Sequence, residues 1–414
     1  MGKRLGNWYF GWNIVAVAAI LTLLTVGMRM GIGPFFLPMA RDLGFSRSLL
    51  AGIVALGMLC YGLAMPVAGH LAATRGTRFV LVAGTALIAA STAATVMAHS
   101  AIGFLLAFGV GLSVGLGMVS PVALTPVLTR WFIRRRGMAL LFLSTGSMGG
   151  MALLTPVFTY AIDVAGWRAT LAGFAAFFVL FTIPAALFIV RDEPPPGADL
   201  EPSAAGRAPA PKAPAANLGV ADALRTVPFW QVALGLFACG FSMNLLGSQG
   251  VPMLMDHGFD AMTGSLGIGL IGIVALCSTV VLGRLADALE RRQLLATIYF
   301  VRGLGFFGLV AAGADWQLYS VSVIGGVAWA GSIALASAIL ADVYGTRTVG
   351  VLYGLCYFGH QVGGTISAWL GGWAYETFGT HWIAFGSAGL LLLGAAAISL
   401  QLPRRSLQVS PAAG

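Results

Sequence analysis

Residues 137–150 are GMALLFLSTGSMGG, and residues 350–363 are GVLYGLCYFGHQVG. The glycines recur at one offset: Gly137, Gly146 and Gly150 match Gly350, Gly359 and Gly363. A second pair of stretches, GHLAATRGTR at 69–78 and GRLADALERR at 283–292, repeats in the same way, and Asp163 and Gly166 match Glu376 and Gly379. The chain therefore contains an internal duplication, and each copy is expected to form the same set of elements.

Both copies consist of long apolar runs. Hydrophobic residues make up 58% of the 414 positions and charged residues 9%, whereas a soluble domain carries about 25% charged residues. Apolar runs of this length predict transmembrane helices. Twelve are predicted, at 10–33, 46–71, 79–98, 101–129, 137–161, 167–190, 228–252, 262–284, 293–312, 316–342, 348–375 and 380–401.

The predicted fold class is an all-α membrane protein with twelve transmembrane helices in two pseudo-symmetric six-helix bundles. The N-terminal bundle covers 1–190, and the C-terminal bundle with a short tail covers 228–414. Between them, residues 191–227 are rich in proline and alanine, and seven of the 18 prolines lie there. Such a composition cannot bury a core and predicts a linker.

The net charge of +9 is explained by membrane orientation. With the N-terminus in the cytoplasm and twelve crossings, 18 of the 23 Lys and Arg residues fall in cytoplasmic segments and three in outer loops. This asymmetry obeys the positive-inside rule. It predicts a multi-pass protein with both termini in the cytoplasm, and it leaves no reason to expect a nucleic-acid partner.

The two remaining basic residues, Arg29 and Arg302, lie inside predicted spans. A charged residue there costs about 2.5–3.5 kcal/mol on insertion scales and is a functional candidate by default. No acidic residue falls in the middle of a span, so the substrate is expected to supply the negative charge, and a guanidinium suits a carboxylate. The alternatives are that Arg29 extends to the outer interface, and that Arg302 is structural, bonded to carbonyls near Tyr299.

Polar residues in three spans could complete a substrate site. Thr25 lies on the same face of the first helix as Arg29. His360 lies near the middle of the eleventh helix and could couple protons or bind substrate, or it could be a packed histidine. The remaining candidates are Asn244 and Ser248 on the seventh helix and Tyr357 and Gln361 on the eleventh.

Nothing in the sequence indicates an enzyme. It contains no phosphate-binding loop, no zinc-ligand spacing and no convincing nucleophile constellation. The cysteines lie in apolar runs without metal spacing: Cys60, Cys239, Cys277 and Cys356. No cofactor and no metal are expected.

Several motifs match a known family. The loop after the second helix carries Gly69, Leu71, Ala72, Gly76 and Arg78, with Ala73 where an aspartate is usual; the second copy keeps Asp287. Phe10-Gly11-Trp12, RWFIRRRGMALLFLSTGS at 130–147 and GHQVGG at 359–364 are further matches. On these residues the chain resembles the major facilitator superfamily, and within it the bacterial relatives of monocarboxylate transporters. It departs from them at Thr279, where those transporters usually carry an arginine.

The resemblance implies secondary transport of a small organic anion, a monocarboxylate, by alternating access around a site between the bundles. It also implies proton symport, a bacterial inner-membrane location and a monomer surrounded by lipid. Arg78, Asp287, Arg291 and Arg136 are then expected to act in gating or between the bundles. Two alternatives stay open: efflux of drugs or other amphipathic compounds, and, more remotely, a non-transporting receptor on this fold.

Overall fold

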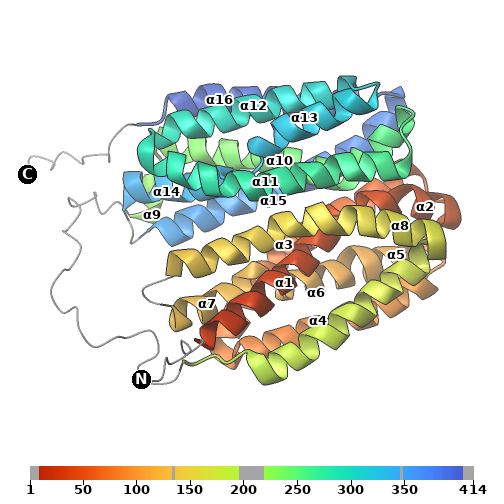
Figure 1. The fold of residues 1–414 in the computed structure, drawn as a ribbon, viewed down its shortest axis with the longest axis horizontal. Helices are drawn as coiled ribbons and strands as arrows, with labels where there is room; N and C mark the ends of the chain where they lie inside the picture. Colours follow the sequence, from red (N-terminus) through yellow and green to blue (C-terminus); the bar gives the residue numbers. More distant parts are fainter. Residues whose placement is uncertain (1–8, 133–135, 195–218, 346–347, 404–414) are drawn as a thin grey trace, which may run out of the picture. The chain divides into compact units, whose positions relative to one another are not determined.

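The computed structural model describes residues 9–132, 136–194, 219–345 and 348–403. The chain forms two compact units, the first from 1–45 and 56–204 and the second from 46–55 and 205–414. The described residues are helical and contain no strand. In each unit the helices run lengthwise beside one another (Figure 1).

The first unit holds the earlier helices. Its elements are α1 (Gly11–Met30), α2 (Gly33–Leu43), most of α3 (Arg47–Arg75), α4 (Thr77–Met97), α5 (Ala101–Phe104), the π-helix η1 (Leu105–Leu112), α6 (Ser113–Met118), α7 (Pro121–Trp131), α8 (Arg136–Pro184) and the π-helix η2 (Ala185–Ile189). The first residues of α3 belong to the second unit.

The second unit holds the later helices. They are α9 (Val220–Leu224), which lies in the segment predicted as linker, α10 (Val227–Asp256), α11 (Ala261–Ala288), α12 (Arg291–Ala311), α13 (Asp315–Val327), α14 (Ser332–Tyr344), α15 (Val349–Phe378), the π-helix η3 (Trp382–Gly386) and α16 (Ser387–Leu400). Helices α12 and α16 pack along their length (Figure 1).

Ten described stretches are long and apolar enough to cross a membrane. One of them, Met138–Ile189, has 52 residues, about twice the number that a single crossing needs. It bends at Gly166, whose φ of 79° favours glycine. Helix α15 has 30 residues and is not among the ten. If the bent stretch counts as two crossings and α15 as one more, the number of crossings is consistent with the twelve predicted spans.

Three predicted spans are not continuous. The first was expected at 10–33, but α1 ends at Met30 and α2 begins at Gly33 and continues to Leu43. Pro34 is in the first turn of α2, where its missing N–H removes no helical hydrogen bond. The fourth span breaks between α6 and α7, and Pro121 likewise stands in the first turn of the helix that follows the break. The tenth span breaks between α13 and α14 at Gly331, whose φ is 96°.

Equivalent glycine contacts in the two units support the internal duplication. A Cβ at Gly150 on α8 would collide with the Leu23 carbonyl of α1, and a Cβ at Gly363 on α15 would collide with the Phe237 carbonyl of α10. The two contacts follow the offset seen in the sequence. Close backbone contact of this kind is how small residues join membrane helices. The α1–α8 and α10–α15 pairs are therefore equivalent seams of the two copies.

Candidate substrate and gating site

Arg29 lies in the last turn of α1, and its side chain turns toward α3. Its guanidinium carbon is 4.7 Å from the centre of the Tyr61 ring, and Tyr61 is buried. A guanidinium over a buried aromatic ring gains a cation–π contact. Arg29 therefore packs against a buried ring of α3 within the first unit.

Thr25, one turn before Arg29, is fully buried. Its hydroxyl donates to the Leu21 carbonyl at 2.8 Å, within its own helix. Hydroxyls that bond the preceding turn can still accept a hydrogen bond from a ligand. Thr25 thus remains available only as an acceptor.

In the second unit the predicted polar residues of α10 and α15 meet. Asn244 and His360 are each 1% exposed. A Cβ at Gly364 on α15 would collide with the Asn244 amide, and one at Gly240 on α10 would collide with the His360 backbone. The glycines of each helix therefore make the room in which the other helix places a polar residue.

The groups on this α10–α15 face differ in how they are satisfied. The Asn244 amide donates to the Gly240 carbonyl at 2.8 Å, and the Ser248 hydroxyl donates to the Asn244 carbonyl at 2.8 Å. The His360 ring stacks on Tyr357 at 5.1 Å between ring centres. Gln361 is buried beside them. The face therefore combines side chains held by their own helix with an aromatic stack.

Arg302 on α12 is buried in the second unit and is 1% exposed. Its guanidinium carbon lies 4.0 Å from the centre of the Trp329 ring, and Nη1 is 3.3 Å from the Cys239 sulfur. Among the described residues no acidic group pairs with it, and neither Nε nor Nη2 has a hydrogen-bond partner. Tyr299, expected as a neighbour, is buried, and its hydroxyl makes no hydrogen bond to any residue that the structure describes.

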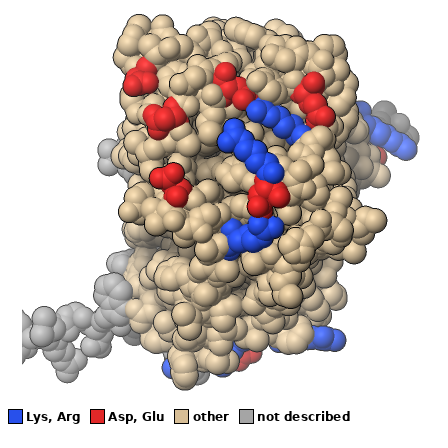
Figure 2. All heavy atoms as spheres, turned by 90° about the vertical axis from the view of Figure 1, so that its right-hand side faces the viewer, with Lys and Arg blue, Asp and Glu red and all other residues tan. Residues whose placement is uncertain are grey.

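Ion pairs at the predicted outer end repeat between the units. Arg168 pairs with Asp42, which also accepts from the Trp167 indole at 3.0 Å. In the second unit Asp256 accepts from His381 at 2.9 Å. Asp42 and Asp256 are 214 residues apart, and Arg168 and His381 are 213 apart. On the face shown in Figure 2 such charged side chains lie next to one another on a mostly uncharged surface.

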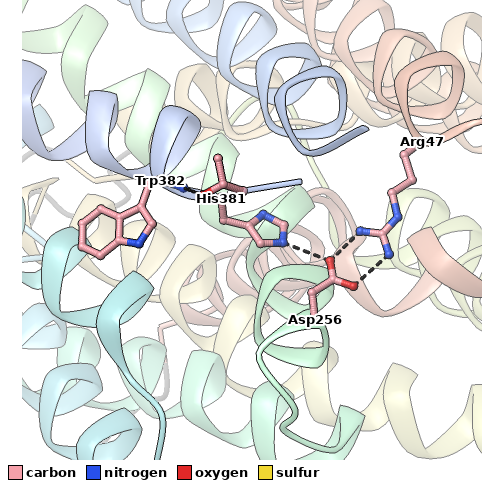
Figure 3. A network of polar contacts seen from close by, with 5 residues as sticks. Arg47, Asp256, His381 and Trp382 are labelled. Carbon is pink, nitrogen blue, oxygen red and sulfur yellow. Dashed lines mark hydrogen bonds and ion pairs between the residues drawn. The ribbon is translucent and has the colours of Figure 1, made fainter. Parts of the chain in front are cut away.

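Asp256 also receives Arg47, from the first turn of α3 (Figure 3). Two guanidinium nitrogens of Arg47 contact its two carboxylate oxygens at 2.5 and 2.8 Å. The Tyr375 ring packs against both of these side chains, with its centre 4.3 Å from the Arg47 guanidinium carbon and 4.2 Å from the centre of the His381 ring. The two parallel hydrogen bonds between Arg47 and Asp256 are the strong, bidentate form of an arginine–carboxylate pair. The start of α3 is thereby fixed to the second unit.

Two further carboxylates shape this end. Glu376 accepts from the backbone N–H of Ser48 at 2.5 Å, at the N-terminus of α3, where the helix dipole favours an anion. Asp260 caps α11 by accepting from the N–H groups of Met262 and Thr263. The hydrogen bonds from Thr263 hold the pKa of Asp260 below its usual value. Burial, with the neighbouring His381, lowers the pKa of His257.

Replacing Asp256 by asparagine is expected to lower stability by about 2 kcal/mol. The change leaves the half-buried Arg47 without a countercharge, and removing one partner of such a pair costs more than the pair contributes. Thermal unfolding of the purified protein measures this. Asp163→Asn, at an exposed acid, is the control and should change nothing; an equal loss in both variants would contradict the role of the network.

The predicted gating residues whose side chains are described make their contacts within their own units. The Arg78 Nε donates to the Val190 carbonyl at 2.5 Å inside the first unit, and Arg292 makes the equivalent bonds to Leu400 and Leu402. Arg291 pairs with Asp342 at 2.5 Å. The side chains of Arg136 and Asp287 lie outside the described residues. Their gating role stays a prediction.

The sequence did not point to Arg47, Asp256 and His381 as partners. Arg47 and Asp256 are separated by 209 residues, and each appeared only as an outer-loop charge. The one available signal was the repeat offset, which relates Asp42 to Asp256 and Arg168 to His381.

Thr279, where the sequence departs from the family pattern, donates its hydroxyl to the Ala275 carbonyl of its own helix at 2.8 Å. No group of three or more His, Cys, Asp or Glu side chains in the described ranges could hold a metal ion.

The chain is similar to known proteins along most of its length. The family model "Major Facilitator Superfamily" matches residues 18–315 and 275–413. Monocarboxylate transporter 11 of Homo sapiens is 29% identical over 428 residues, covering 97% of this chain and 84% of that protein. The uncharacterized MFS-type transporter YcxA of Bacillus subtilis (strain 168) is 24% identical over 381 residues, covering 88% of each chain.

Solved structures share the fold. The chain is similar to the crystal structure of a D-xylose–proton symporter with a TM-score of 0.72 and 14% identity, covering 96% of this chain and 99% of that one. The crystal structure of a bacterial homolog of the human lysosomal transporter Spinster matches with a TM-score of 0.70 and 18% identity. The match covers 98% of this chain and 99% of that one. The relatives are transporters rather than enzymes. The chain therefore belongs to the major facilitator superfamily and is a multi-pass membrane transporter similar to the monocarboxylate transporters.

Proposed function

We propose that the protein is a secondary active transporter that moves a small organic anion, a monocarboxylate, by alternating access with proton symport. The similarity to monocarboxylate transporters over almost the whole chain supports the substrate class. The location proposed is a bacterial plasma membrane, with both termini in the cytoplasm, supported by the distribution of basic residues.

The observation that carries the proposal is the inward position of Arg29. Its guanidinium lies against the buried Tyr61 of α3, within the first unit. A ring beneath one face of a guanidinium leaves its edge N–H groups in plane, and these donors match the two oxygens of a carboxylate. Arg29 is therefore the proposed carboxylate contact, with Thr25 one turn away as an acceptor for a substrate hydroxyl.

The second unit is proposed to contribute polar groups from α10 and α15. His360 and Gln361 are buried beside Asn244 and Tyr357. Histidine can gain and lose a proton near neutral pH, so His360 is the proposed coupling residue. Protonation of the substrate itself is the other route for the proton.

Uptake into proteoliposomes tests the substrate class. A panel of small monocarboxylates, with matching amides and dicarboxylates, is offered to the purified protein under an inwardly directed proton gradient. Saturable uptake of a monocarboxylate, lost when the gradient is collapsed, supports the proposal. Transport of amphipathic cations or neutral compounds without any carboxylate would instead support drug efflux, and binding without movement would indicate a receptor.

Changing His360 to glutamine is expected to flatten the pH dependence of uptake. Glutamine keeps a hydrogen-bonding group of similar reach but cannot carry a proton. Initial rates measured from pH 5.5 to pH 8 should vary several-fold in the wild type and much less in the variant. A profile that keeps its shape in the His360→Gln protein would exclude His360 from coupling and leave substrate protonation as the route.

A further inference from the structure

Arg302 lines a small cavity within the second unit. The cavity is about 20 Å³ and is surrounded by apolar side chains and glycines of α10 to α13, among them Leu246, Phe306, Val321 and Gly325, with Trp329 following α13. It has room for about one water-sized particle. A monocarboxylate with its carbon chain does not fit this volume.

The guanidinium in this cavity is poorly compensated. Arginine stays charged at any physiological pH. Its partners are the Trp329 ring and the Cys239 sulfur, and a thiol sulfur is a weak acceptor. Nε and Nη2 bond to nothing among the described residues. A buried charge without a countercharge is costly, so a counter-ion from solution would relieve the site.

We propose that Arg302 binds a monatomic anion, of which chloride is the physiological example, in this cavity of the second unit. The size of the cavity selects a halide over a carboxylate. The unpartnered nitrogens supply the donors, and the mostly apolar wall strengthens their attraction for an anion. The site is separate from the proposed carboxylate contact at Arg29, which lies in the first unit, and does not depend on the identity of the transported substrate.

Gly305 on α12 gives a direct way to narrow the cavity. It lines the cavity, and a Cβ built there would lie 3.6 Å from the Cα of Gly325, which also lines it. This is an ordinary van der Waals distance, so alanine at this position adds a methyl group between two lining residues and leaves Arg302 in place. Gly394 on α16 also has room for a Cβ but does not line the cavity, so Gly394→Ala is the matched control.

The test is thermal unfolding of the purified protein in detergent, without any organic substrate. Sodium methanesulfonate, which carries no carboxylate and whose anion is too large for the cavity, is replaced stepwise by sodium chloride or bromide at constant ionic strength. A saturable rise in Tm of about 2–4 °C is expected from preferential binding to the folded state. Gly394→Ala should keep this rise, whereas Gly305→Ala and Arg302→Met should abolish it.

A wild-type Tm that does not respond to halide would overturn the proposal and leave the cavity to water. A halide response that survives in both Gly305→Ala and Arg302→Met would also overturn it, because the ion would then bind elsewhere. If Arg302→Met does not fold, Gly305→Ala decides alone. The readout does not involve transport, so failure of the monocarboxylate proposal would leave this result unaffected.

Discussion

Replacing Gly240 by alanine is expected to prevent correct folding of the second unit. A Cβ at this position would lie closer than 3.0 Å to the carbonyl oxygen, carbonyl carbon and Cα of His360, a range that real Cβ atoms essentially never show. The obstacle is backbone on the facing helix, which cannot rotate away. We expect a loss of at least about 3 kcal/mol, at the upper end of the effects of overpacking.

Size-exclusion chromatography and thermal unfolding in detergent measure this loss. Gly363→Ala on α15 should behave in the same way, because its Cβ would meet the backbone of Phe237 and Phe241. Gly354→Ala on the same helix has nothing within 4 Å and should be neutral or stabilising, since alanine is the better helix former. A normal elution profile and Tm for Gly240→Ala would contradict the close packing of α10 on α15.

The second large effect is expected at Arg29. Arg29→Ala should reduce saturable monocarboxylate uptake by about tenfold to a hundredfold, because hydrogen bonds to a charged group contribute about 1.5–3 kcal/mol. Stability should change little, since the residue is half-buried and its cation–π contact is modest. Initial uptake rates at several substrate concentrations, with expression and Tm recorded in parallel, separate the two effects.

Two further variants sharpen this result. Arg29→Lys keeps the charge but loses the planar pair of donors, so its uptake should fall between that of the wild type and the alanine variant. Arg41→Ala removes an exposed arginine from the last turn of α2 and should transport normally. Uptake by Arg29→Ala at the wild-type rate would remove Arg29 from the substrate site and with it the main support for an organic anion.

The sequence predicted the helices and the duplication because both depend on local patterns. Apolar runs must be helical in lipid, where every backbone group needs a partner within the chain. The matched glycines, such as Gly150 and Gly363, recur because two equivalent helix pairs need the same close contact. These features are written in neighbouring residues or in a fixed offset, so they can be predicted without coordinates.

The breaks and the charge network could not be predicted in this way. Whether a helix continues through Gly31 or Gly331 depends on which neighbours satisfy the freed backbone groups, and hydropathy does not contain that information. The bond between Arg47 and Asp256 joins segments far apart in the chain. For the candidate site, the sequence predicted Arg29, Arg302 and His360 as functional residues. It did not predict that Arg302 would line a cavity with room for about one water molecule.

The glycine seams also have a mechanical consequence. Where backbone touches backbone, no side chain can change rotamer to accommodate a new angle between the two helices, and interiors packed this closely deform little. The α1–α8 pair and the α10–α15 pair should therefore each move as a rigid body. Distances between two spin labels on the same helix pair, measured by pulsed electron paramagnetic resonance, should stay constant under all ligand conditions. They therefore serve as an internal reference for measuring other displacements.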